Sequence, residues 1–158
     1  MLESKKDFVE PAIEYAFNYL QEKGHNNISL FFIGTDLPFI NDLDLRNLSF
    51  SMIYNPAILA RGDDMCLAIN YCDSMIMTAS GSTYGWWISY LMPANSTIFY
   101  NSQITDHASF TKDVHDYDIF LDEWIKLTVY NETAHREKWW WYQRHNWSRE
   151  KADGTYFI

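Results

Sequence analysis

The sequence lacks any run of about 18 apolar residues, and its start, MLESKKDFVEP, has neither the basic beginning nor the apolar stretch of a secretion signal. It therefore shows neither a membrane anchor nor a signal peptide. Positive charge is also scarce, since 12 Lys and Arg stand against 21 Asp and Glu, for a formal net charge of −9. Nucleic acids and anionic membrane surfaces attract basic patches, so we expect neither as a partner.

Cysteine and familiar catalytic motifs are equally scarce. Cys66 and Cys72 are the only cysteines, and their spacing puts them on different faces of a helix, so we expect two small buried thiols without a disulfide. The chain has no Gly-Lys phosphate loop and no GxGxxG, HExxH, paired CxxC or GxSxG motif. These absences exclude the nucleotide-binding, metalloprotease and hydrolase sites that such motifs build.

One acidic segment could still coordinate a metal, because it combines carboxylates with imidazoles. Its members are His107, Asp113, His115, Asp116 and Asp118. Their spacing matches no recognisable ligand pattern, so we interpret the segment as a solvated loop and assign no metal.

Asn-x-Ser/Thr sequons, in contrast, are more frequent than the one or two that composition would give by chance. The excess predicts a glycosylated protein of the secretory pathway, and a truncated N-terminus would reconcile it with the missing signal. The sequons are Asn27, Asn47, Asn95, Asn131 and Asn146.

The spacing of apolar residues predicts an α/β domain. Residues 8–22 have helical periodicity, and four runs resemble strands: NISLFFIG, NLSFSMIY, SMIMTA and STIFYN. Helices that begin at Asp64 and at TYGWWISYLM separate the last three strands. The order predicts a Rossmann-like, mainly parallel sheet, in which the first strand is buried on both faces with its core at residues 31–33.

The pattern dissolves beyond about residue 104. The aromatic stretch WIKLTVYNETAHREKWWWYQRHNW keeps no period over a useful length. We therefore expect one α/β unit over residues 1–125, followed by an aromatic-rich tail, residues 126–158, that packs across the unit or is partly disordered.

A small, hydroxyl-rich turn, residues 80–83, separates the third strand from its helix. In parallel sheets ligands bind beyond the carboxyl ends of strands, where small side chains and helix N–H groups suit a nucleotide phosphate. Alternatively, Ser82 or Thr83 only caps the helix, and Trp86 and Trp87 fit a core position better than ligand stacking.

Two acidic positions follow the same geometry. Asp36 follows the first strand, and Asp63 or Asp64 opens a helix after the second, so each could accept from a base or ribose hydroxyl. The alternatives are a turn that Asp36 forms with Pro38 and a helix cap at Asp64.

The stretch CDSMIMTASGSTYGWWISYL, with FFIGTD and RGDDMCLAINYCD upstream and STIFYN downstream, resembles the donor-binding part of the alpha-1,2-fucosyltransferases, especially their nematode branch. The resemblance covers roughly residues 5–125. It implies one Rossmann-like half of a GT-B-like enzyme that transfers L-fucose from GDP-fucose to a galactose hydroxyl of a glycan, with inversion, without a required metal, at the lumenal side of the Golgi membrane. Residues 1–125 would then be the GDP-sugar-binding half-domain.

The resemblance also implies which residues contact the sugar donor. Ser82, Thr83 and Tyr84 match the family's donor-site turn. Asp36 and Asp64 match acidic positions near the nucleotide, Asp64 with an offset of one residue. The implied donor-binding set is Asp36, Asp64, Ser80, Gly81, Ser82, Thr83 and Tyr84.

One departure concerns catalysis. The family's His-x-Arg-Arg motif, whose arginine is taken to neutralise the departing diphosphate, is absent from this sequence, and no general base is assignable. We therefore expect this chain alone to be inactive or nearly so. The alternatives are a non-catalytic nucleotide- or glycan-binding fragment, a partner of a full-length relative, and a decayed copy.

Overall fold

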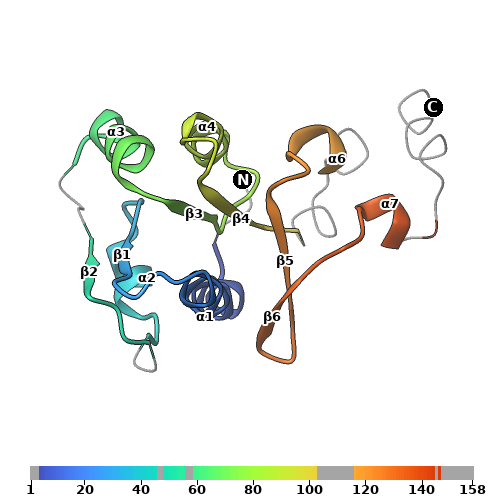
Figure 1. Cartoon of the computed structure of the whole chain (residues 1–158), viewed down its shortest axis with the longest axis horizontal. Coiled ribbons are helices and arrows are strands. Elements are labelled where there is room, and N and C mark those ends of the chain that lie inside the picture. Colours follow the sequence, from blue (N-terminus) through green and yellow to red (C-terminus); the bar gives the residue numbers. More distant parts are fainter. Residues whose placement is uncertain (1–3, 46–47, 56–58, 103–115, 145, 147–158) are drawn as a thin grey trace.

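The strands of this chain are mainly parallel, and helices cover both faces of the sheet (Figure 1). The computed structural model describes residues 4–45, 48–55, 59–102, 116–144 and 146. The predicted mixed α/β fold with a mostly parallel sheet is confirmed.

The larger sheet has the strand order β3-β4-β5-β6. The first three strands run parallel, and the fourth returns antiparallel to the third. Its strands are β3 (Ser74–Met77), β4 (Thr97–Asn101), β5 (Ile125–Tyr130) and β6 (Thr133–Arg136).

A separate, two-stranded parallel sheet contains β1 (Ser29–Phe31) and β2 (Met52–Tyr54), which α2 (Leu37–Asn41) connects. The two predicted strands are confirmed, but the prediction that the first is buried on both faces is wrong. Ser29 is exposed, and residues 30–33 are only half-buried. The reason is that, among the residues described, β1 pairs with β2 alone and forms no ladder with β3.

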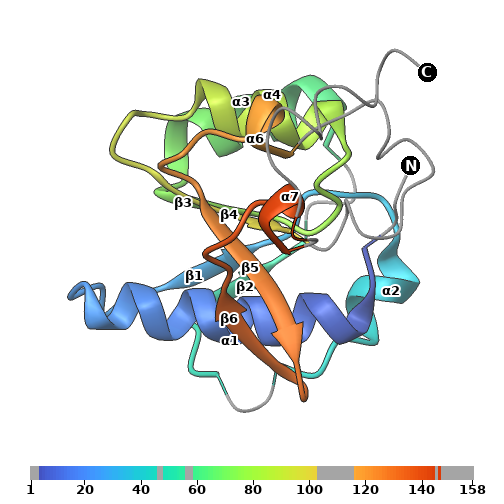
Figure 2. The ribbon, with the colours of Figure 1, turned by 90° about the vertical axis from the view of Figure 1, so that its right-hand side faces the viewer.

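Helices cover the larger sheet from two sides (Figure 2). α1 (Lys6–Glu22) packs on one face, where its apolar stripe meets Phe99, Ile125 and Leu127. The opposite face is covered by α3 (Arg61–Tyr71), α4 (Thr83–Leu91) and α6 (Asp116–Ile119). The buried stripe of α1 consists of Phe8, Val9, Ala12, Ile13, Ala16 and Phe17.

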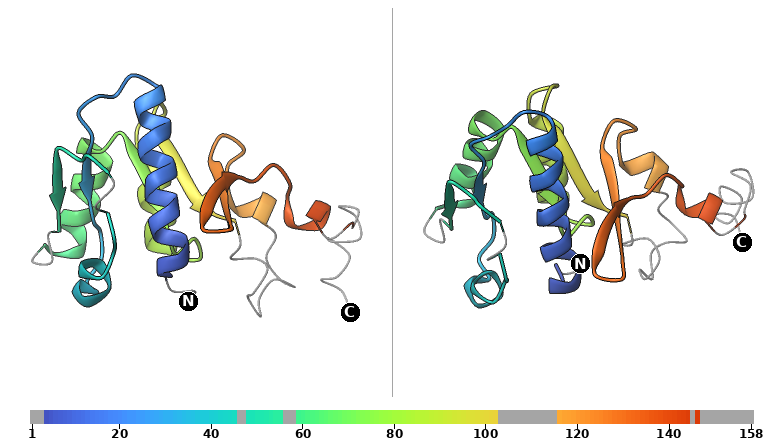
Figure 3. Two further views of the ribbon diagram at one scale, coloured as in Figure 1. Left: turned by 90° about the horizontal axis from the view of Figure 1, so that it is seen from below. Right: turned by 60° about the horizontal axis from the view of Figure 1, so that its bottom comes forward.

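The C-terminal part of the described chain contains regular structure that the sequence pattern missed. β5 and β6 form a hairpin beside β4, so residues 125–136 join the larger sheet as strands that the sequence pattern did not predict. The boundary expected after residue 125 falls at the first residue of β5. In Figure 3 this hairpin and the β1-β2 pair lie on opposite sides of α1. The short helix α7 (Trp141–Arg144) follows.

Two predictions about single side chains need correction. The cysteines are free, as expected, but Cys66 is exposed and Cys72 only half-buried. Trp86 is half-buried and donates its Nε1–H to the Ile119 carbonyl at 2.7 Å. Trp87, on the outer side of α4, is 51% exposed and is therefore not a core residue.

Candidate functional site

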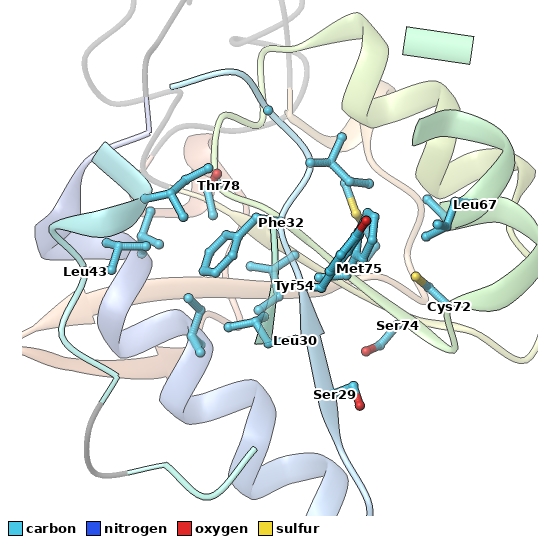
Figure 4. A pocket seen from close by; sticks show the side chains of 18 of the residues that line it. Ser29, Leu30, Phe32, Leu43, Tyr54, Leu67, Cys72, Ser74, Met75 and Thr78 are labelled. Atoms are coloured by element: carbon cyan, nitrogen blue, oxygen red, sulfur yellow. The ribbon is translucent and has the colours of Figure 1, made fainter. Parts of the chain in front are cut away.

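A cavity of about 1150 Å³ lies between β1 and β3 (Figure 4). Since β1 pairs with β2 and β3 pairs with β4, the strands lie in the order β2-β1, cavity, β3-β4-β5-β6. Along the chain, β2 is added on one side of β1, whereas β3 and the strands after it are added on the other side of β1. In open α/β sheets this reversal point is where ligands bind, beyond the carboxyl ends of the strands.

The segments that follow β1 and β3 border this cavity together. Residues 34–36 come soon after β1 and Thr78 directly after β3, and all of them line the cavity. The Thr78 hydroxyl also forms a 2.5 Å hydrogen bond with the Ser4 hydroxyl. The carboxyl-terminal ends of β1 and β3, the strands that flank the cavity, therefore border one crevice.

The lining of the crevice is mainly apolar and carries acidic charge only. Phe31, Phe32 and Tyr54 provide aromatic surface, and Asp36 and Asp73 are its charged residues. None of the lysine, arginine or histidine residues in the described part of the chain lines it. The interior therefore suits a neutral ring with N–H or O–H groups better than a phosphate.

Asp36 caps a helix and also lines the crevice. Its Oδ1 accepts a hydrogen bond from the Phe39 amide at 3.1 Å at the start of α2, with Pro38 in the first turn. The prediction that Asp36 forms a turn with Pro38 is therefore confirmed, and this turn is the N-cap of α2. A carboxylate accepts several hydrogen bonds, so the cap still allows Oδ2 to accept from a ligand hydroxyl.

Asp64 is buried in the first turn of α3 with one oxygen unsatisfied. The residue is 8% exposed, and its Oδ1 has no hydrogen-bond partner among the described residues. Burial, followed by the negative charge of Asp63, raises the pKa of this carboxyl above 3.8. The N-cap of α3 is Ala60, so the alternative that Asp64 is a helix cap is wrong. A ligand N–H or O–H would satisfy the orphan oxygen.

Ser80 connects the ends of two strands. It is 3% exposed, donates to the Met77 carbonyl at 3.0 Å and accepts from the Asn101 amide at 2.8 Å. Both hydrogen bonds tie the carboxyl end of β3 to that of β4. Its hydroxyl is thus engaged in the fold.

The rest of the turn starts α4. Ser82 is the N-cap, and its hydroxyl oxygen accepts from the Gly85 amide at 3.3 Å, which confirms the capping interpretation. Gly81 and Thr83 are exposed, whereas Tyr84 packs against the core. These residues follow Thr78 at the same sheet edge, but none of them, nor Asp64, lines the crevice that contains Asp36.

A buried polar cluster on β4 and β5 was not found from the sequence. Lys126, 8% exposed, lies opposite Tyr100, and its Nζ is 3.4 Å from the centroid of the Trp140 ring. Burial lowers the pKa of Lys126, and burial followed by the charge of Asp116 raises the pKa of Tyr100. The alternating residues of IKLTVY followed by Asn-Glu are the signal that could have indicated this hairpin.

The sequons and the acidic segment are only partly covered by the described residues. Four sequon asparagines are exposed, and Asn47 lies outside the described residues, as do His107, Asp113 and His115. Within the described ranges no three His, Cys, Asp or Glu side chains group as a metal site would require, and no helix there has the length and apolarity to span a bilayer. The exposed asparagines are Asn27, Asn95, Asn131 and Asn146.

Curated proteins similar to this chain transfer sugars, according to their names. A galactoside 2-alpha-L-fucosyltransferase of Caenorhabditis elegans is 25% identical over 147 residues, which cover 78% of this chain and 36% of the relative. Another C. elegans protein of that name is 38% identical over 65 residues, 40% of this chain and 18% of the relative. A third, provisionally given the same name, is 28% identical over 134 residues, 78% of this chain and 35% of the relative.

The chain spans about a third of the length of the curated relatives that it matches over most of its own length. No family model matches it, and no solved structure matches it.

Proposed function

We propose, from the premise that the chain is a divergent relative of the galactoside 2-alpha-L-fucosyltransferases, that it forms the sugar-donor-binding part of an enzyme that transfers L-fucose from GDP-fucose to a galactose hydroxyl of a glycan. The observation that supports this beyond sequence similarity is the crevice at the reversal point between β1 and β3. Nucleotides occupy this position in parallel α/β folds, including the Rossmann-like halves of GT-B-like enzymes.

Two regions of the protein bind different parts of the nucleotide. The base and ribose occupy the apolar crevice, where Asp36 accepts from a hydroxyl and Asp64 accepts from an N–H or O–H at the neighbouring helix end. The diphosphate stays outside this acidic interior, at the N-terminus of α4. There the small residue Gly81 and the amide of Thr83 let an anion approach the positive end of the helix dipole.

The reaction we propose is a single inverting displacement. The acceptor hydroxyl oxygen forms a bond to the anomeric carbon of fucose while the bond from that carbon to the phosphate oxygen breaks. GDP leaves with the bonding electron pair, and the acceptor proton passes to a base that we do not assign to a residue of this chain. We propose that no metal is required.

Cellular context follows from the same relationship. We propose that the activity belongs to the lumenal side of the Golgi membrane and that exposed sequons, such as Asn131 at the hairpin tip, carry N-glycans. An acidic surface with net charge −9 is compatible with a glycan acceptor, which is neutral, and unsuited to nucleic acid.

Nucleotide selectivity tests the proposal. GDP, GDP-fucose and, as a control, UDP are titrated into the purified chain by calorimetry, with circular dichroism to confirm folding. We expect GDP and GDP-fucose to bind about tenfold or more tightly than UDP, because guanine presents a ring N–H beside an exocyclic amino group to the acidic acceptors, whereas uracil presents one ring N–H between two carbonyl oxygens. Equal affinity for all three, or no binding to folded protein, would contradict the proposal.

Activity is a separate question, because the chain has no His-x-Arg-Arg motif. We expect the 158-residue chain alone to bind GDP-fucose with little or no transfer, since stabilisation of the leaving group is often a large catalytic contribution. Fucose transfer to a galactoside acceptor at rates typical of enzymes, about 1 per second or more, would contradict this expectation.

A further inference from the structure

α4 presents large side chains to the outside of the molecule. Figure 1 shows this helix between α3 and α6, on one outer side of the larger sheet. Trp87, Tyr90 and Leu91 lie on its outer face and are 51%, 50% and 48% exposed. Exposed aromatic side chains that lie together often mark a binding site. The proposed donor site uses the N-terminus of α4 and gives these side chains no role.

The aromatic rings support one another in a fixed arrangement. Trp86 donates its Nε1–H to the Ile119 carbonyl at 2.7 Å, which anchors its ring against α6. The Tyr90 ring stacks on the Trp86 ring, with centroids 4.9 Å apart and an interplanar angle of 12°. The Trp87 ring is nearly perpendicular to the Tyr90 ring, at 89°, with centroids 5.9 Å apart. Because the rings are preorganised, a ligand that stacks on them loses little affinity to side-chain ordering.

The segment that carries these rings is uncharged, although the whole chain is acidic. Residues 74–105 contain no Asp, Glu, Lys, Arg or His, whereas the full sequence has a formal net charge of −9. Charged partners are recognised through complementary charges, which this segment does not offer. The ligand that suits it is therefore neutral.

The exposed area is too small for a stable protein interface. The three side chains offer roughly 300 Å² together, because about half of each is exposed and a large aromatic side chain has about 150–250 Å² in all. A stable protein–protein interface covers about 800 Å² on each partner. A sugar ring, in contrast, fits on a single aromatic ring.

These rings also lie near the proposed donor site. We place the diphosphate at the amide of Thr83, the first residue of α4. An α-helix rises about 1.5 Å per residue, so Trp87 lies about 6 Å and Tyr90 about 10 Å farther along the helix. A ligand on these rings is therefore close to the sugar that the diphosphate carries.

We propose that Trp87 and Tyr90 bind a galactose-containing glycan beside the sugar donor. Galactose has an axial C4 hydroxyl on one face, which leaves C–H groups on the other face to stack on the Trp87 indole. The Tyr90 hydroxyl exchanges a hydrogen bond with a sugar hydroxyl, and Leu91 extends the apolar surface. This inference rests on the proposed function, which supplies such a glycan as the acceptor.

Saturation-transfer NMR on the full chain tests the site. The probe is N-acetyllactosamine, which contains galactose, and the comparison sugar is maltose, which contains only glucose. The variants are Trp87→Ala, Tyr90→Phe and the matched control Trp139→Ala, whose side chain is 58% exposed outside α4. Circular dichroism confirms that each variant is folded.

We expect wild type and Trp139→Ala to transfer saturation to the galactose C–H protons and to bind N-acetyllactosamine equally. Trp87→Ala should bind it about tenfold or more weakly. Tyr90→Phe keeps the ring and removes the hydroxyl, so we expect a smaller loss, about threefold. Maltose should receive less saturation than N-acetyllactosamine, and equal transfer to both sugars would overturn the assignment to galactose.

The site is overturned if folded wild type transfers no saturation to N-acetyllactosamine, or if folded Trp87→Ala binds it as tightly as wild type. It is also overturned if the sugar does not bind and Trp87→Ala instead dissociates a wild-type dimer in ultracentrifugation. GDP titration separates this failure from that of the proposed function, since we expect Trp87→Ala to bind GDP as wild type does. Glycan binding without GDP binding contradicts only the donor site, and GDP binding without glycan binding contradicts only the aromatic site.

Discussion

Asp64 illustrates, at the scale of one residue, a cost to stability at a candidate binding position. Its buried Oδ1 has no hydrogen-bond partner in the described part of the chain, and burial raises its pKa above the unfolded value, so the folded state binds a proton more readily than the unfolded state. The stability associated with that proton is fully present below the unfolded pKa near 3.8 and is lost as pH rises through the folded pKa.

We therefore expect Asp64→Asn to increase the free energy of unfolding at pH 7 by about 1 kcal/mol, the scale of one unsatisfied buried group, and to reduce the loss of stability between acidic and neutral pH. Urea titrations at pH 4 and pH 7 measure both effects. Asp118→Asn, at an exposed position on α6, is the control and should leave stability nearly unchanged. A destabilising effect of Asp64→Asn at pH 7 would contradict this view of the residue.

For Ser80 we expect the opposite effect, because removal of its hydroxyl should destabilise the fold. Ser80→Ala removes the hydrogen bonds to the Met77 carbonyl and the Asn101 amide, and we expect a loss of about 1–3 kcal/mol in chemical denaturation. Ser82→Ala, which removes only a helix cap, should cost about 1 kcal/mol. Equal midpoints for wild type and Ser80→Ala would show that this hydroxyl does not tie the strand ends together.

At the scale of elements, the β5-β6 hairpin turns through two residues with positive φ. Asn131 has a φ of 48° and Glu132 a φ of 59°, between the paired residues Tyr130 and Thr133. A two-residue turn with both φ values positive is type I′, which favours Asn-Gly. The geometry therefore places the least suitable side chain of this turn at Glu132.

Glu132→Gly should consequently stabilise the chain by about 0.5–1 kcal/mol, because glycine adopts positive φ without strain. Glu132→Ala removes the same charge but keeps a Cβ, so we expect no such gain from it. Both changes keep the Asn131 sequon. Thermal denaturation of the two variants side by side decides the matter, and an alanine variant as stable as the glycine variant would refute the backbone explanation.

The sequence predicted those elements whose local pattern agrees with their packing. β3, α4 and β4 follow one another as continuous apolar runs separated by a capped turn, so their order and approximate bounds were predictable. The β5 strand was missed because Lys126 interrupts its apolar run at a buried position. The ring of Trp140 and the negative charge of Asp116 stabilise the lysine there, and no local pattern encodes these contacts.

Burial was less predictable than the elements themselves. The run around Phe31 is continuously apolar, which is typical of a strand enclosed by neighbours on both sides. It is half-buried because the sheet is interrupted beside it, a property of the whole molecule. The candidate site shows the same limit, since Asp36 was predictable from its place after a strand, whereas the orphan oxygen of Asp64 follows only from packing.

At the scale of the whole molecule, the resemblance stated from the sequence motifs is confirmed by the relationship to the nematode fucosyltransferases. The fold adds a crevice at the point where the strand order reverses, and of the residues singled out from the sequence Asp36 lines it. Our central claim is that the carboxyl edge of the sheet binds the nucleotide of the sugar donor.

The most direct test of that claim is calorimetric titration of GDP into wild type, Asp36→Asn and Asp64→Asn, with Asp118→Asn as the matched control. We predict that wild type and Asp118→Asn bind GDP equally, and that each of the other two variants binds it about tenfold more weakly, a loss of about 1.4 kcal/mol. If the folded wild type does not bind GDP, or if Asp36→Asn and Asp64→Asn both bind it as tightly as wild type, the carboxyl edge of the sheet is not the nucleotide site.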